Sequence, residues 1–187
     1  MPTANPRLNR DSWIDAALAL LLQSGPDAVA VQPIARQLGT TKGSFYWHFS
    51  SRDDLLRATL TRWETAAGDD LIASVDARTA DSGKKAEALV EEVTAGERPG
   101  ELMLLAGTNH PDVAAAVERV ARKRIDYLAR QLRNSGLTPA AAQRRALLVY
   151  TAYLGYAVLA ASAPGVLPDS ARGRRALVSE VAELVLP

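Results

Sequence analysis

Apolar residues recur every three or four positions along most of the chain, and no stretch alternates with a period of two. This spacing predicts amphipathic helices rather than strands. We therefore expect an all-α protein. Caps and chain breakers divide it into about nine helices, near residues 9–24, 32–38, 42–48, 51–77, 82–95, 102–106, 112–134, 139–163 and 169–186, with a further break at 96–100.

Several of these helix ends carry recognisable local signals. Asn9 and Thr41 are expected to cap the first and third helices, and Ser51 opens a capping box for the fourth. Gly39 ends the second helix, so the second and third helices are joined by a tight turn, which is a helix-turn-helix arrangement. The fourth helix is long, and we expect Gly68 to bend it.

Composition narrows the functions that are open to the chain. Of 187 residues, 22 are Lys or Arg and 21 are Asp or Glu, so no global field points to nucleic acid or membrane. The absence of cysteine excludes thiol chemistry, and two histidines cannot form a multi-histidine metal site. We expect no metal and no cofactor. The N-terminus lacks an apolar signal core, which favours a cytoplasmic location.

The stretch Thr40–Phe49 concentrates aromatic, hydroxyl and basic side chains in a chain that is 5% aromatic as a whole. Phe45 and Phe49 lie four apart and are expected to anchor the segment in the core. One short helix cannot bury every side, so several of the remaining side chains are expected to point outward. The N-terminus of the helix and its hydroxyl and basic side chains suit the phosphates and base edges of DNA. We expect phosphate contacts from Thr41, Lys42, Gly43, Tyr46, His48 and Arg52, base contacts from Thr40, Ser44 and Trp47, and either kind from Gln32.

The stretch Ala146–Ala163 carries no charge. Its length is that of a membrane span, but we reject this interpretation because alanine and tyrosine make it weakly apolar. A helix that is apolar on all sides must be buried on all sides, which favours a homodimer with the last helix as its companion. The residues expected at the interface, with Tyr153 and Tyr156 facing the partner or solvent, are Ala152, Tyr153, Gly155, Tyr156, Ala160, Leu177, Val181 and Leu184.

Residues 9 to 60 resemble the DNA-binding head of the TetR family of transcriptional regulators. The features that carry the resemblance are Ile34-Ala35, Leu38-Gly39, Lys42-Gly43-Ser44-Phe45-Tyr46-Trp47-His48-Phe49, and Ser51-Arg52 followed by Leu55-Leu56. The resemblance implies an all-helical homodimer, usually a repressor, with a three-helix head joined by a long fourth helix to a helical-bundle body. It implies a DNA-binding domain at 1–52, with its core at 9–49, and an effector-binding and dimerisation domain at 53–187.

The chain departs from the family pattern at four positions. Ala30 stands where the family usually has a Thr or Ser cap on the second helix, which removes a cap worth about 1 kcal/mol. Gln32 replaces a frequent Arg, Thr40 a usual Val, and Arg52 a usual Lys. These departures leave the family resemblance intact but make the choice of operator unpredictable.

The leading hypothesis is therefore a dimeric repressor that leaves a palindromic DNA operator when a small-molecule effector binds the body. The alternative is a DNA-binding dimer without such an effector, whose body serves dimerisation or protein contacts. An enzyme is not expected, because no nucleophile, phosphate-loop or metal pattern is present. The residues considered for an effector site, each of which could instead be ordinary packing, are Trp63, Asn109, His110, Tyr127 and Tyr150.

Overall fold

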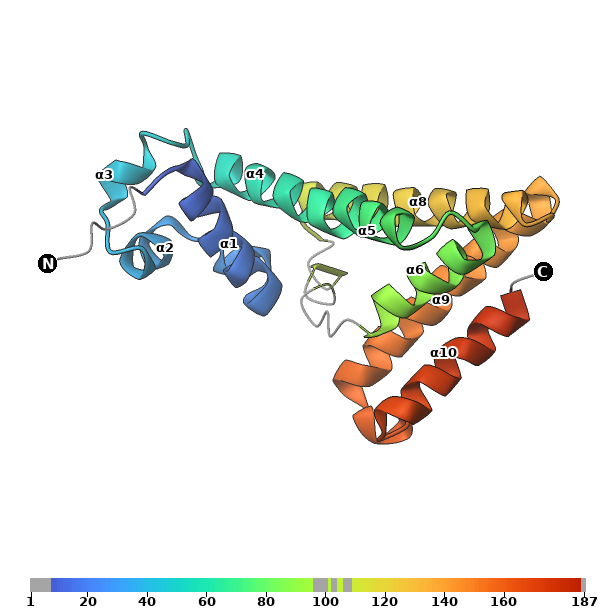
Figure 1. Cartoon of the computed structure of the whole chain (residues 1–187). Coiled ribbons are helices and arrows are strands. Elements are labelled where there is room, and N and C mark those ends of the chain that lie inside the picture. The colour runs from blue at the N-terminus through green and yellow to red at the C-terminus, as the bar shows by residue number, and fades with distance from the viewer. Residues whose placement is uncertain (1–7, 96–100, 102–103, 106–108, 186–187) are drawn as a thin grey trace, which may run out of the picture. The chain divides into compact units, whose positions relative to one another are not determined.

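The computed structural model describes residues 8–95, 101, 104–105 and 109–185 (Figure 1). Helices and no strands occur among these residues, which confirms the all-α prediction. The predicted break at 96–100 lies outside the described residues, as does most of the predicted helix at 102–106. The bounds are α1 (Arg10–Ser24), α2 (Val31–Gln37), α3 (Lys42–Phe45), α4 (Arg52–Glu64), α5 (Leu71–Arg78), α6 (Ser82–Ala95), α8 (Pro111–Asn134), α9 (Pro139–Ser162) and α10 (Ala171–Val185), with short turns η1 (Pro26–Ala28), η2 (Thr65–Asp70) and η3 (Pro164–Val166).

The chain divides into two compact units. The first, called the head unit, comprises residues up to Thr65 together with 103–117. The second, called the body unit, comprises 66–102 and the residues from Glu118 onward. The functional division at residue 52, between DNA binding and the remaining roles, stays a prediction.

The core of the head unit is built around aromatic side chains. α1 packs against α4 and α2, and α2 packs against α3. Trp13 and Phe45 are fully buried and meet edge to face, with ring centroids 5.4 Å apart. Phe49 is also buried and stacks on Phe45 at 5.5 Å. Both residues that we expected to anchor the segment therefore lie in the core.

The predicted caps of the head are present. The side chain of Asn9 accepts the N–H of Ser12 in a capping box, and the hydroxyl of Thr41 accepts the N–H of Ser44 at 3.3 Å. No side chain caps α2 at Ala30. α3 is shorter than predicted and ends at Phe45, because the following amides bond carbonyls only three residues back, as in a tight turn.

The long fourth helix is helical from Arg52 to Arg78, as expected, but its regular α-helical pattern is interrupted. Residues Thr65–Asp70 form a π turn between α4 and α5, and Gly68 lies inside it. In the body unit, α6 packs against α5, α9 and α10. The buried core of this unit comprises Leu71, Val75, Ala86, Ala88, Leu89, Tyr127, Leu128, Ala129, Leu132, Ala142, Ala146, Val149 and Tyr153.

By length and composition, α9 could cross a membrane, with a mean hydropathy of 1.2. A single helix of this kind among the described residues is weak evidence for a membrane protein. Four large apolar side chains on α9 are exposed in the protomer, so the helix is not buried on all sides by its own chain. These are Leu147, Leu148, Val158 and Leu159.

Candidate nucleic-acid interface

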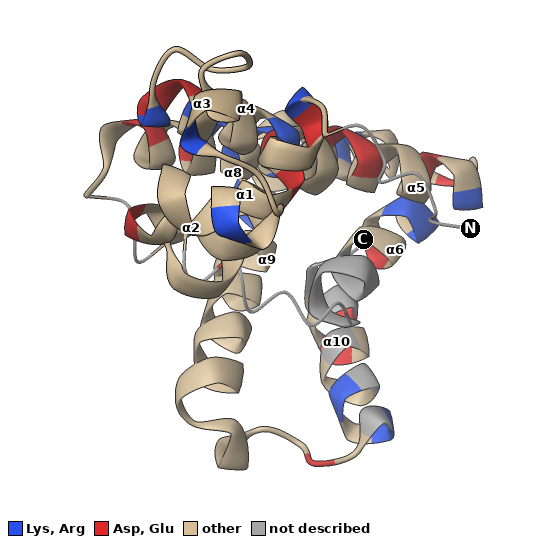
Figure 2. Cartoon of the chain, turned by 90° about the vertical axis from the view of Figure 1, so that its left-hand side faces the viewer, with Lys and Arg blue, Asp and Glu red and all other residues tan. Residues whose placement is uncertain are grey.

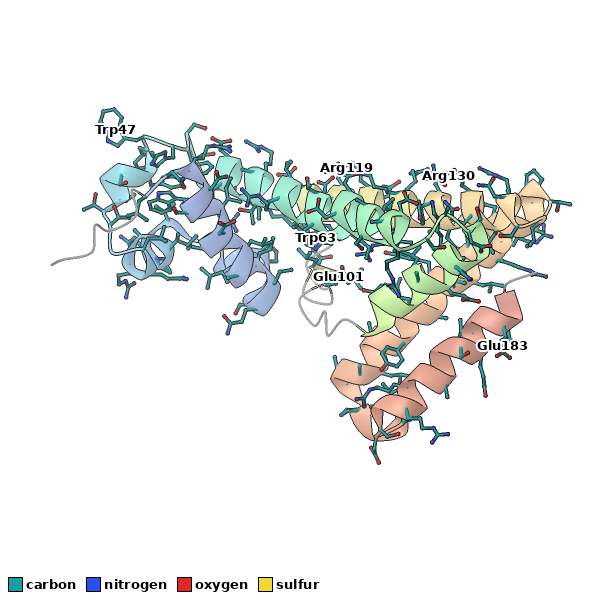
Figure 3. The ribbon with its side chains drawn as sticks, in the orientation of Figure 1. Trp47, Trp63, Glu101, Arg119, Arg130 and Glu183 are labelled. Carbon is teal, nitrogen blue, oxygen red and sulfur yellow. The ribbon has the colours of Figure 1, made fainter. Side chains whose placement is uncertain are left out.

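The segment that includes α3 and the turn after it presents its polar and aromatic side chains to solvent. Trp47 is 89% exposed and Tyr46 is 57% exposed, although both adjoin buried Phe45 in the sequence. Trp47 points away from the ribbon of the head (Figure 3). Lys42 is exposed, and Ser44 is half-buried. Exposed large aromatic side chains are unusual on a protein surface that serves no partner.

Tyr46 is anchored at one edge and open at the other. Its ring meets Phe45 edge to face at 5.2 Å, and the Nζ of Lys42 lies 6.0 Å from its centroid. The phenolic hydroxyl of Tyr46 and the ammonium of Lys42 are therefore neighbouring donors on one exposed surface. Such donors bind phosphate oxygens, which set the position of a protein on DNA.

Two glycines shape the approach to this surface. Gly39 has a φ of 64°, the left-handed conformation that the tight turn between α2 and α3 requires. The nearest atom that a Cβ at Gly43 would meet is Oγ1 of Thr41, at 3.6 Å, an ordinary contact. The packing of the head itself therefore tolerates a side chain at Gly43, and the lack of one leaves room for an external partner.

Of the remaining residues expected at DNA, Gln32 and Thr41 are exposed, while Thr40 and His48 are half-buried. The hydroxyl of Thr41 already accepts a bond as the cap of α3.

The side chain of Arg52 makes hydrogen bonds within the head unit. Its Nε donates to the carbonyl oxygen of Val29 at 2.9 Å, and another guanidinium nitrogen donates to the carbonyl oxygen of Pro26. Its third nitrogen pairs with Asp53 at 3.2 Å. Arg52 therefore ties the start of α4 to the segment before α2, and its phosphate contact stays a prediction.

Sequence reasoning missed a second arginine in the head unit. Arg62 on α4 bonds Asp11 at 2.6 Å and Asp15 at 2.9 Å, both on α1. The two acids lie four residues apart on one face of α1, a spacing that could have been read as a paired acceptor. Arg62 thus fixes α1 against the helix that follows the interface.

The residues considered for an effector site are divided between the two units. Trp63 is buried in the head unit, which also contains Asn109 and His110. Nδ1 of His110 is buried and has no hydrogen-bond partner among the described residues. In the body unit, Tyr150 is half-buried, and burial raises the pKa of its hydroxyl.

Tyr127 matches the alternative of ordinary core packing. Its ring is 1% exposed, and its hydroxyl donates to Asp76 at 2.8 Å. Burial and the bond to Asp76 raise the pKa of Tyr127. A hydrogen bond from Lys85, 2.7 Å away, and the one from Tyr127 lower the pKa of Asp76. The tyrosine hydroxyl is therefore committed within the protein.

One residue expected at a dimer interface is buried inside the protomer instead. Tyr153 is 5% exposed, and its hydroxyl bonds the carboxylate of Glu101, which corrects its predicted outward orientation. The reason is helical phase, because Tyr153 shares the inner face of α9 with buried Ala146 and Val149. Ala152, Gly155, Ala160, Leu177 and Leu184 are exposed, and Tyr156 and Val181 are half-buried.

The segment Thr40–Phe49 follows α2 after a tight turn and is anchored in the core by Phe45 and Phe49. This arrangement is a helix-turn-helix. Residues 14–59 match the family of bacterial regulatory proteins described as the tetR family. The matched segment, about a quarter of the chain, is therefore similar to the DNA-binding part of a family of bacterial regulatory proteins.

Relatives of known sequence also match only a part of the chain. The tetracycline repressor protein class D of Escherichia coli is 44% identical over 52 residues, which cover 28% of this chain and 24% of that protein. The uncharacterized HTH-type transcriptional regulator YwcC of Bacillus subtilis is 48% identical over 46 residues, covering 25% and 21%. The match thus spans about a quarter of the length of these relatives.

Solved structures extend the likeness over almost the whole chain. The reduced form of NemR from Escherichia coli has a TM-score of 0.78 at 19% identity, covering 95% of this chain and 97% of that one. SCO4454, a TetR-family transcriptional regulator from Streptomyces coelicolor, has a TM-score of 0.72 at 19% identity, covering 95% and 96%. At this identity the likeness establishes the fold and leaves ligands and partners open.

Proposed function

We propose that this protein is a dimeric transcriptional repressor that binds a palindromic DNA operator and acts in the cytoplasm. The observation that carries the proposal is the exposed row formed by Lys42, Tyr46 and Trp47 on buried aromatic anchors. Lys42 and Tyr46 hold phosphates, and Trp47 reaches base edges together with Thr40 and Ser44. His48, Gly43, Thr41 and Gln32 complete the contact surface.

The proposed dimer is supported by one face of α9. Leu148, Ala152, Gly155 and Leu159 recur at helical spacing, and all four are exposed. Figure 2 shows that the part of α9 leading to η3 carries no charged side chain. A Cβ added at Gly155 meets no atom within 4 Å, so nothing in the protomer requires glycine there. Close approach of a partner helix would require it.

Response to a small molecule is the further part of the proposal. The unpartnered Nδ1 of His110 is a polar atom that a ligand could satisfy. Trp63, Asn109 and Tyr150 remain the other candidates. The alternative, a DNA-binding dimer whose body makes only protein contacts, is distinguished by screening small molecules for release of DNA.

Selecting bound fragments from the organism's genome, followed by salt titration of the best fragment, tests DNA binding. Lys42→Ala is expected to flatten the plot of log affinity against log salt by about 0.9, because one phosphate contact is lost. Lys84→Ala, an exposed lysine on α6, is the matched control and should leave the slope unchanged. Failure of the wild-type protein to select any fragment would contradict the proposal.

Replacing Gly43 by Ala is expected to change stability and DNA affinity in opposite directions. The head has room for the methyl group, and alanine favours the helix by up to about 1 kcal/mol. The same methyl group would hold a DNA backbone away from α3, so operator affinity should fall. Thermal unfolding and operator titration measure the two effects. Equal or tighter DNA binding by the variant would show that DNA does not approach at Gly43.

A further inference from the structure

Arg124 on α8 is a buried cation near the start of the body unit. Its side chain is 3% exposed. Two of its guanidinium nitrogens bond the two carboxylate oxygens of Glu101, at 2.7 and 3.1 Å. Its Nε donates to the backbone carbonyl oxygen of Ala67 at 3.0 Å. One planar side chain thus connects a buried acid to the backbone of another helix.

Arg124 keeps its charge at this site. Glu101 (labelled in Figure 3) is 12% exposed and also accepts the hydroxyl of Tyr153. Burial lowers the pKa of Arg124, but the bonds and charge of Glu101 more than offset this, so the pKa lies above its ordinary value. Replacing a buried ion pair by apolar groups is often neutral for stability. Stability alone therefore does not account for the pair.

The carbonyl that Arg124 holds belongs to the π turn of residues Thr65–Asp70. In a regular α-helix, the carbonyl oxygen of Ala67 would accept the N–H of Leu71. A π turn shifts such bonds by one residue, which is rare and often found at functional positions. Ala67 is 2% exposed, so its carbonyl needs a protein partner. The Nε of Arg124 is one such partner, and it comes from outside the turn.

Lys123, the residue before Arg124, contacts the same turn. The Nζ of Lys123 pairs with Asp69 at 2.7 Å. A Cβ at Gly68 would lie 2.9 Å from Cδ of Lys123, closer than carbon atoms normally approach. Two successive residues of α8 therefore hold Ala67, Gly68 and Asp69, all within the body unit.

The π turn lies where the chain passes from the head unit to the body unit. The boundary between the head unit and the body unit falls between Thr65 and Ala66, inside the π turn. α4 ends where this turn begins, and its other end, at Arg52, follows shortly after the segment Thr40–Phe49. Kinks in helices occur at π turns and where a side chain enters the helical hydrogen-bond ladder, and both conditions are met here.

We propose that Arg124 is a positioning residue that keeps the π turn in register and thereby sets the direction of α4 and of the DNA-binding head. Glu101 neutralises and orients Arg124, so loss of this pair releases the turn toward a regular α-helix. The consequence for DNA rests on the proposed function. A change of about 20° at the base of α4, which has 13 residues, moves its far end by about 7 Å.

Distances between spin labels, measured by pulsed electron-spin resonance, test the positioning role without DNA. The chain has no cysteine, so Gln37→Cys and Arg133→Cys, both at exposed positions, place the only labels in the head and the body. Labelled protein diluted in unlabelled protein reports distances within one chain. Circular dichroism of each variant checks that its helix content is retained.

Arg124→Met combined with Glu101→Gln removes both charges and keeps an acceptor for Tyr153. This variant is expected to shift or broaden the distance distribution by several Å, about the 7 Å scale of a 20° bend. Arg124→Lys should do the same, because one ammonium cannot replace the fork that serves both acceptors. Arg122→Met is the matched control, since Arg122 pairs only at the surface of α8 with Glu118, both about 70% exposed.

Distributions that superimpose for wild type and both Arg124 variants would overturn the proposal, and so would an equal shift in Arg122→Met. Operator binding is a second readout. The Arg124 variants should bind a full palindrome about tenfold or more weakly, because the two heads no longer match the half-site spacing. If the wild type binds no DNA, the proposed function fails, but the distances still decide the role of Arg124.

Discussion

Replacing Arg52 by Met is expected to lower the free energy of unfolding of the head by roughly 2–4 kcal/mol, measured by urea denaturation. The side chain donates to the carbonyl oxygens of Val29 and Pro26, which adjoin the start of α2. Val29 is fully buried and Pro26 is buried. Methionine would fill the space but leave both carbonyls without this donor, and unmade buried hydrogen bonds are costly.

Arg57→Met is the matched control on the same helix. Arg57 is 58% exposed, and its ion pair with Asp112 spans 3.9 Å, so its loss should change stability by less than about 1 kcal/mol. Arg52→Lys should remain destabilised, because a single ammonium does not reproduce the planar fork that reaches two carbonyls.

A phosphate role for Arg52 would give the opposite pattern. Stability would then be unchanged, while the salt slope of DNA binding would fall by about 0.9 and Arg52→Lys would restore it. We instead expect the folded fraction of Arg52→Met to keep the wild-type slope. An unaltered denaturation midpoint would show that the bonds to Val29 and Pro26 contribute nothing.

The bonds of Arg52 within the head show which information the sequence lacks. Its acceptors are backbone carbonyls 23 and 26 residues earlier in the chain, and a backbone carbonyl has no signature in the sequence. The anchors Phe45 and Phe49, by contrast, follow from four-residue spacing, and the cap at Thr41 follows from residue type. Local patterns therefore predicted the scaffold of the interface, while pairing over long separations had to be observed.

The body unit follows the same rule. Arg124, Glu101 and Tyr153 come from segments more than twenty residues apart, and their meeting depends on tertiary packing. An irregularity near Gly68 was predictable because glycine weakens a helix, but its π register was not. That register depends on the close approach of Lys123 and Arg124.

The sequence predicts only in part which face of α9 is buried in its own protomer and which is exposed. A helix that is apolar on all sides has no strong periodic contrast, so its sequence does not show which side meets its own core. The structure turns Val149 and Tyr153 inward and leaves Leu148, Ala152 and Gly155 exposed. The burial argument for a dimer therefore holds for a narrower stripe than the whole helix.

Introducing a charge in this stripe, as Leu148→Glu, is expected to yield monomers and to weaken operator binding by about 10²–10⁴-fold. Leu148 is 61% exposed in the protomer, so the protein should still fold with glutamate there. Across a symmetric interface each carboxylate would be buried without a partner, at a cost that an apolar contact cannot offset. Light scattering of the purified protein gives the mass, and titration with a full palindrome gives the affinity.

Two further variants separate dimer loss from a general effect of surface charge. Val166→Glu places the same charge on an apolar side chain in η3 that is 68% exposed and lies outside the stripe, and it should remain dimeric. Gly155→Leu adds no charge, and its Cβ would meet no atom of its own protomer within 4 Å, yet it should separate the partners by blocking close approach. If Leu148→Glu and Gly155→Leu both keep the mass of a dimer, the stripe on α9 is not the interface.

The monomeric form of each variant should still bind a single half-site weakly, with about half the salt dependence of the dimer, because its own phosphate contacts remain.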